Sequence, residues 1–288
     1  MEMQLIGRIG GGLAALLVLG SPIPAPAPAF DLVSEPVQDA DDVVAALLAE
    51  GGVRFEPERG RFSIAARVAT RDDLLEFLLV GPKGSAYESL FATEADPTLL
   101  NTAFLALGLE EGRNVRWVFA DDGAEIAPAE GSRADAAGDW LGGREVRLEP
   151  PSGDGLLMYA GWTEGDEDFL FRIEDLLGNI ESNAPLPRQR WTYIGSRFVE
   201  SAKTGEEVFI AALEQNLVNI AWFPEGNTLV TATHPVCERQ DVWVGNPWLV
   251  PEPNTPVRIF FSRDPMTTLP VDIREQLPDA TAEGEESR

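Results

Sequence analysis

The chain has 288 residues, and its 48 acidic side chains against 22 basic ones give a formal net charge of −26. This acidity argues against DNA or RNA as a partner, because phosphate binding needs clustered Lys and Arg. With one cysteine, Cys237, and one histidine, His234, the chain cannot make an intramolecular disulfide, a zinc site of four cysteines or of two cysteines and two histidines, or a cysteine-ligated iron–sulfur cluster. No cofactor is expected.

The first 29 residues have the pattern of a signal peptide. Arg8 precedes an uncharged run over residues 9–19, and a Pro- and Ala-rich stretch ends in Ala27-Pro28-Ala29. This A-x-A pattern predicts cleavage before Phe30 and export to the periplasm, the cell envelope or the medium. An uncleaved membrane anchor is the alternative. No integral membrane span is expected after cleavage, because no later stretch is long and apolar enough.

Residues 30–49 are expected to form a lead-in and a short helix, which the apolar spacing places at residues 39–50. Residues 50–263 then form one domain. Its first half has predicted strands at 53–55, 61–68 and 74–80. The clearest helix is predicted over residues 96–107, because Asp96 is a natural N-cap, Pro97 suits the first helical position and an apolar stripe follows.

The second half of the domain is mostly β. A strand at 115–120 is followed by an acidic, Gly- and Ala-rich loop at 121–143, and a short helix is expected at 173–177. Further strands are predicted at 144–149, 156–162, 191–199, 207–213, 217–223, 228–233, 242–243 and 257–261, with a tight hairpin turn at 214–216. Residues 264–288 are predicted to be an acidic disordered tail.

These elements predict an α+β fold, dominated by antiparallel β-sheet with one or two short packed helices. No period of 20–50 residues recurs, which excludes a solenoid or a propeller.

The standard catalytic motifs are absent from the sequence. It contains no P-loop, no H-E-x-x-H and no G-x-S-x-G, and no catalytic residue or metal-ligand set is assigned. His234 and Cys237 could form a nucleophilic pair, although a strand-end His and a packed Cys explain them as well. The acidic run 166–168 could attract Ca²⁺, but it lacks the EF-hand pattern and is more simply a solvated loop.

Two aromatic segments are candidates for ligand binding. Trp243 and Trp248 bracket a Pro-containing loop that could hold a peptide or a sugar. Residues 188–198 contain three arginines and include Trp191, Ser196 and Arg197, an island that could hold a carboxylate or phosphate. Alternatively, these arginines neutralise nearby acids.

Several motifs resemble the YdjY-domain family over about residues 50–263. They include Tyr87-Glu88-Ser89-Leu90-Phe91, the helix within 96–112, the run from Arg172 through 185–187 to 191–198, and 253–257. The resemblance implies an exported bacterial protein without established activity, in a family frequent in planctomycetes. Many members carry His where this chain has Tyr87, which leaves Glu88 and Ser89 as a shared site or a shared turn.

The sequence therefore favours a non-enzymatic module of the periplasm or cell envelope that binds an unknown small ligand or an envelope protein. Its candidate binding residues are Lys83, Glu88, Ser89, Trp191, Ser196, Arg197 and Trp243. The alternative is an exported hydrolase that uses a carboxylate pair or His234. A third possibility is a structural envelope protein whose acidity gathers cations.

Overall fold

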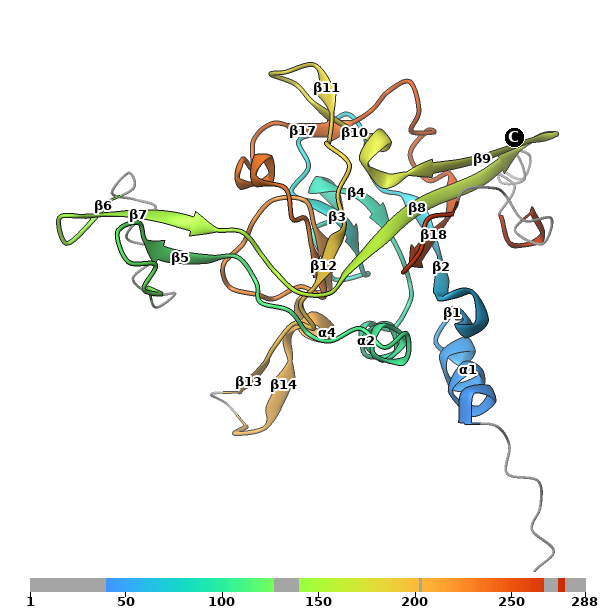
Figure 1. Ribbon diagram of the computed structural model, residues 1–288. Coiled ribbons are helices and arrows are strands. Elements are labelled where there is room, and N and C mark those ends of the chain that lie inside the picture. The colour runs from blue at the N-terminus through green and yellow to red at the C-terminus, as the bar shows by residue number, and fades with distance from the viewer. Residues whose placement is uncertain (1–39, 127–139, 202–203, 267–273, 278–288) are drawn as a thin grey trace, which may run out of the picture. The chain divides into compact units, whose positions relative to one another are not determined.

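The computed structural model describes residues 40–126, 140–201, 204–266 and 274–277 (Figure 1). The predicted signal peptide, most of the predicted 121–143 loop and most of the predicted tail lie outside these ranges. Among the described helices, none is both long and apolar enough to cross a membrane.

The main sheet closes into a barrel of eight strands. In order around the barrel these are β2 (Arg61–Val68), β18 (Pro256–Ser262), β8 (Gly155–Glu164), β12 (Trp191–Tyr193), β16 (Val230–Thr231), β15 (Asn216–Asn219), β3 (Phe77–Val80) and β4 (Ser89–Ala92). Closure comes from the end of β2, where Arg67 pairs with Ala92 and Val68 with Phe91. Neighbouring strands are antiparallel except for the parallel pairs β15–β16 and β3–β4. The predicted α+β class holds, but the sheet is a closed barrel and not a simple antiparallel sheet.

Alternating side chains divide the barrel into an inner and an outer face. Phe261 on β18 pairs with Phe62 on β2 and with Met158 on β8, and all three belong to the main core. The next residue, Phe260, pairs with Tyr159 and joins a separate outer cluster. Both faces of β8 are therefore covered, which explains why its sequence is a nearly continuous apolar run.

The helix α2 (Pro97–Ala106) contributes one aromatic side chain, Phe104, to the core of the barrel. Phe104 lies 4.9 Å from the ring of Phe62, 5.1 Å from Tyr193 and 5.2 Å from Phe261, and these three residues belong to three different strands. The predicted cap is present, since Oδ1 of Asp96 accepts hydrogen bonds from the backbone N–H groups of residues 98 and 99 at 2.8 and 3.0 Å. The helix predicted over 96–107 is confirmed.

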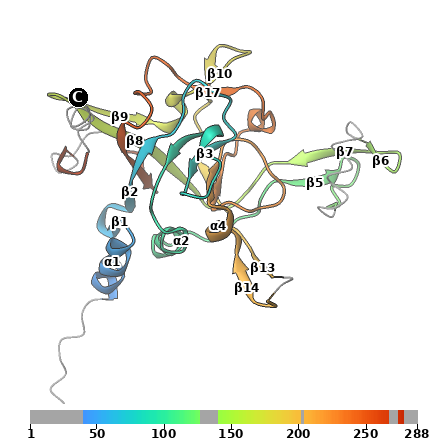
Figure 2. The ribbon, with the colours of Figure 1, turned by 180° about the vertical axis from the view of Figure 1, so that it is seen from behind.

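Other elements flank the barrel. The helix α1 (Ala40–Glu50) precedes β1 (Val53–Glu56), which pairs with β2, while β9 (Glu167–Arg172) pairs with β8. Three small sheets complete the described structure (Figure 2): β5 (Arg116–Phe119) with β7 (Arg144–Glu149) and β6 (Trp140–Leu141); β11 (Ala184–Pro185) with β10 (Leu177–Asn179) and β17 (Trp243–Gly245); and β13 (Phe198–Glu200) with β14 (Glu207–Phe209). Short 3-10 turns span Pro57–Arg59, Ala86–Glu88, Ile173–Leu176, Pro235–Glu238 and Arg274–Gln276.

The chain differs from the sequence prediction at several boundaries. The strand predicted over 191–199 is broken, because Gly195 and Ser196 both adopt positive φ, at 69° and 64°. The strand predicted over 207–213 becomes a helix, α4 (Ile210–Glu214), after residue 209. The segment 214–216 is consequently a turn from helix to strand and not a hairpin turn.

Part of the predicted disordered tail is ordered. Leu277 follows the last 3-10 turn and is buried in the outer cluster beside Leu157, Tyr159 and Phe260. This apolar contact explains why 274–277 is folded although the surrounding sequence is acidic.

Candidate functional site

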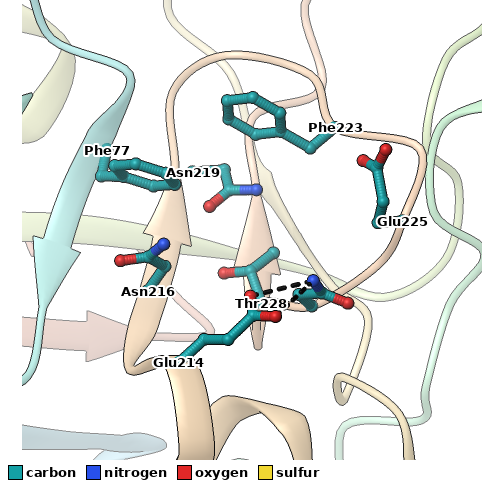
Figure 3. A pocket seen from close by; sticks show the side chains of 8 residues that line it. Phe77, Glu214, Asn216, Asn219, Phe223, Glu225 and Thr228 are labelled. Atoms are coloured by element: carbon teal, nitrogen blue, oxygen red, sulfur yellow. Dashed lines mark hydrogen bonds between the residues drawn. The ribbon is translucent and has the colours of Figure 1, made fainter. Parts of the chain in front are cut away.

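A pocket of about 140 Å³ lies on the outer face of the barrel beside β3 and β15 (Figure 3). Its walls come from one residue of β3, the end of α4, β15 and the loop that follows β15. The lining residues are Phe77, Glu214, Asn216, Asn219, Phe223, Glu225, Asn227 and Thr228. The side chain of Phe77 belongs to an apolar cluster that is distinct from the main core, which places the pocket outside the barrel.

One side of the pocket is fixed by the turn between α4 and β15. Gln215 ends α4 in the left-handed conformation, with φ of 60°, and Asn216 begins β15. The backbone N–H of Lys83 donates to Oε1 of Gln215 at 2.9 Å, and that of Ser85 donates to Oδ1 of Asn216 at 3.0 Å. The loop between β3 and β4 is thereby held against the pocket.

An aromatic pair forms a second wall. The rings of Phe77 and Phe223 stack with their centroids 5.5 Å apart and an interplanar angle of 17°. The loop carrying Phe223 is held in place by Asn114, whose Nδ2 donates to the Phe223 carbonyl at 2.7 Å. Such an aromatic wall offers an apolar surface of defined shape to a bound molecule.

The polar floor of the pocket contains an acceptor with no partner. Asn219 is only 4% exposed, and its Oδ1 makes no hydrogen bond within the described part of the chain. Asn219 pairs with Phe77 on one side and with Thr231 on the other. Oγ1 of Thr231, on a fully buried residue, also lacks a partner among the described residues. Buried polar atoms are nearly always hydrogen-bonded, so these two neighbours are exceptions, and of the two only Asn219 lines the pocket.

The rim is organised by Asn227. Its Nδ2 donates to both carboxylate oxygens of Glu214 at 2.9 Å, and its Oδ1 accepts from Nε of Arg197 at 2.8 Å. Oγ of Ser196 donates to the Asn227 carbonyl at 3.1 Å. Ser196 and Arg197 therefore touch a lining residue without lining the pocket themselves.

The structure places the other predicted residues in different surroundings. Lys83 is exposed on the loop described above, and Glu88 is half-buried. Ser89 is buried, pairs with Phe77 across β3 and β4, and donates its hydroxyl to the carbonyl of residue 91 at 2.9 Å. The segments 83–89 and 196–197 thus approach the pocket from two sides, the first through β3 and the α4–β15 turn and the second through Asn227.

The two predicted tryptophans belong to the core and not to a binding surface. Trp191 and Trp243 are both fully buried. Nε1 of Trp191 donates to Oε1 of Glu174 at 3.2 Å, and Nε1 of Trp243 donates to the carbonyl of Arg239 at 3.1 Å. In the Pro-containing loop that follows Trp243, Trp248 is 91% exposed.

Of the three arginines in the island, Arg188 is paired with an acid, as the simpler interpretation expects, whereas Arg190 binds backbone carbonyls and Arg197 binds the amide of Asn227. Nη2 of Arg188 donates to Oδ2 of Asp175 at 2.7 Å, while both η nitrogens of Arg190 donate to the carbonyl of Arg263, at 2.9 and 2.6 Å. These groups are already engaged, so residues 188–190 do not form an open anion site.

The His234–Cys237 pair lacks an activated thiol. Burial raises the pKa of Cys237 to about 12, and the expected burial of this residue is confirmed. Nδ1 of His234 accepts a hydrogen bond from the backbone N–H of Val236 at 3.2 Å. The thiol is therefore protonated at neutral pH and is a poor nucleophile.

Sequence reasoning did not single out the residues that line the pocket. A signal was present: Asn216, Asn219 and Asn227 lie within a short segment, and asparagine is depleted in strands. Asn216 and Asn219 begin and end a strand whose other two residues are apolar and buried, so a special role for their amides could have been inferred.

Comparison with known proteins found no matching family model, no matching curated protein and no matching solved structure. The resemblance to the YdjY-domain family gains no support from these comparisons and stays a prediction.

Proposed function

We propose that this protein is an exported binding module of the periplasm or cell envelope, related to the YdjY-domain proteins, that holds a small ligand in the outer pocket of its barrel. The observation that carries the proposal is a preformed pocket that is lined by two stacked rings and by Asn219, whose amide makes no hydrogen bond with another described residue.

The chemistry of the lining supports binding. Amide groups, a threonine hydroxyl and two aromatic rings are typical of sites that orient a ligand within an apolar cleft. The described lining contains no Ser, Cys, His or Lys that could act as a nucleophile. Its aromatic wall and its rim are fixed by hydrogen bonds from Asn114 and Arg197, so the pocket is formed without a ligand.

A test compares the wild-type protein with two variants in a ligand screen. Purified protein would be screened by thermal shift and ligand-detected NMR against amines, sugars, organic acids and short peptides. Asn219→Leu removes the unpartnered amide of a lining residue at nearly constant volume and should abolish the response to any hit. Thr192→Val is the matched control, because Thr192 is buried on β12, which β16 separates from β15, and does not line the pocket. Hits that bind Asn219→Leu as well as wild type would refute the proposal.

One observation favours a second candidate function. Glu214 and Glu225 line the same pocket, and a pair of carboxylates is what a glycoside hydrolase requires. A hydrolase would lose the cleavage of a nitrophenyl glycoside in Glu225→Gln. The control variant Glu164→Gln, at an exposed position at the end of β8, would keep it. Absence of cleavage by the wild-type protein would remove this candidate.

A further inference from the structure

A second pocket lies beside the small sheet in which β10 is placed between β11 and β17 (Figure 1). Its volume is about 270 Å³, close to the lower end of the range of about 300–1,000 Å³ that is typical of small-molecule sites. Two large apolar side chains of its lining, Ile180 and Trp248, are 56% and 91% exposed. Neighbouring exposed apolar side chains with polar groups around them mark sites of interaction.

The loop that carries Trp248 is fixed in place. The backbone N–H of Trp248 donates to Oδ1 of Asn246 at 3.1 Å, and Nδ2 of Asn246 donates to the carbonyl of Asp175 at 3.0 Å. The backbone N–H groups of residues 249 and 250 donate to the Asn246 carbonyl at 3.1 and 2.9 Å. The backbone of Trp248 is therefore held beside the pocket without a ligand, which lowers the entropic cost of binding.

The lining of this pocket offers hydrogen-bonding groups but no charge. None of its eleven described residues is acidic or basic, although 24% of the chain is charged. Oδ1 of Asn179 accepts from the backbone N–H groups of residues 181 and 182 at 3.0 and 2.9 Å, which leaves its Nδ2 without a partner in the described structure. The amide of Asn183 is exposed and has no partner there either. Free amides supply both donors and acceptors, so they suit an uncharged ligand rich in hydroxyl groups.

The edges of the small sheet argue against an extended peptide as the ligand. A peptide that adds a strand to a sheet needs an open strand edge. The N–H of Gly245 faces away from β10 and donates to the carbonyl of Arg71 at 2.8 Å, so the outer edge of β17 is occupied. At the opposite edge, β11 has only two residues and ends in Pro185, which has no N–H to donate.

We infer that this pocket is a second binding site and that its ligand is a neutral saccharide. The C–H face of a sugar ring lies against the indole of Trp248, and the sugar hydroxyls exchange hydrogen bonds with the amides of Asn179 and Asn183. The inference goes beyond the proposed function, because the described linings of the two pockets share no residue.

Isothermal titration with neutral oligosaccharides tests this site. The probes are cellotetraose, maltotetraose and chitotetraose, and tetragalacturonate is an anionic comparison. At least one neutral probe should bind, and Trp248→Ala should lower its affinity at least about tenfold. The Tm of this variant should not change, because the side chain is 91% exposed. Tyr87→Ala is the matched control and should bind as wild type does, since the Tyr87 ring is 72% exposed and lines neither pocket.

Two further variants separate stacking from hydrogen bonding. Trp248→Tyr keeps a planar ring and should retain the affinity within about threefold. Asn183→Gly removes the amide, tolerates the positive φ of 50° at this position and should lower the affinity about threefold. Salt should leave the affinity unchanged, because the lining is uncharged, and tetragalacturonate should bind more weakly, because the net charge of −26 repels an anion.

The source of the sugar is identified by comparing each tetrasaccharide with its monosaccharide. Equal affinities identify a free sugar as the ligand, whereas stronger binding of the tetrasaccharide identifies a glycan chain. If no neutral saccharide binds at millimolar concentration, or if binding survives in Trp248→Ala, the inference is wrong. A proline-rich peptide that binds through Trp248 while no saccharide does would also overturn it.

Asn219→Leu distinguishes the two pockets, because this variant should bind saccharides at Trp248 as wild type does. Screening the outer pocket in Trp248→Ala protein keeps a saccharide held at the second site from being counted there. Loss of saccharide binding in Trp248→Ala alone supports this inference and leaves the outer pocket to its own test.

Discussion

Replacing Asn219 by leucine should stabilise the ligand-free protein. The Asn219 amide is 96% buried, from its exposed fraction of 4%, and its Oδ1 has no partner in the described structure. Burying an unpaired acceptor costs about 1–3 kcal/mol, and leucine fills nearly the same volume without that cost. We expect the free energy of unfolding to rise by about 1 kcal/mol and the Tm by about 2–4 °C.

Urea unfolding followed by tryptophan fluorescence would measure this change. Asn114→Leu is the matched control, because the Nδ2 of Asn114 does have a partner, the carbonyl of Phe223 at 2.7 Å. This control should lower stability by about 1 kcal/mol. A loss of stability in Asn219→Leu as large as in the control would show that the Asn219 amide is satisfied in the folded protein, which would remove this support for the proposed pocket.

Three other experiments test the aromatic packing in the barrel and the burial of Glu76 and Cys237. Phe104→Ala should lower the free energy of unfolding by about 3–5 kcal/mol in urea, since it empties the space among three aromatic rings in the barrel, and a loss below about 1 kcal/mol would contradict this packing. Burial and the neighbouring Glu88 raise the pKa of Glu76 in the folded protein. The stability that this carboxyl contributes is therefore fully present below the unfolded-state pKa of about 4.3 and is lost as the pH rises through the folded-state pKa. Glu76→Gln should therefore raise the Tm at about pH 7 but not at about pH 4, and an equal effect at both values would exclude the shift. Cys237 should react with iodoacetamide only when the protein unfolds, which mass spectrometry of native and urea-treated protein would detect; rapid labelling of the native protein would disprove its burial.

Local chemistry made parts of the fold predictable. The helix near residue 100 follows from its capping Asp96 and from Pro97, and both act where the sequence places them. The strand at 61–68 follows from its alternating pattern and is found at the same residues. Signals of this kind depend on neighbours along the chain, so the sequence alone carries them.

Closure of the barrel depends on residues far apart in the sequence. It requires the end of β2, beyond the residues that pair with β1, to pair with β4, and no periodicity in either segment encodes that pairing. The same limit applies to Trp191 and Trp243. The arginines and prolines beside these tryptophans suggested a binding surface, but the positions of the tryptophans on β12 and β17 bury them in the core.

The candidate site was only partly accessible from sequence. Ser196 and Arg197 were singled out for their charge and polarity, and they reach the rim through Asn227. Asn219 escaped notice because its importance lies in a missing partner, which only the three-dimensional arrangement reveals.

An NMR titration of ¹⁵N-labelled protein with the strongest hit of the ligand screen would test the binding site most directly. We expect saturable chemical-shift changes to concentrate at the backbone amides of residues 214–228 and at Phe77, and to disappear in Asn219→Leu. Saturable changes confined to other residues would contradict the proposed binding site.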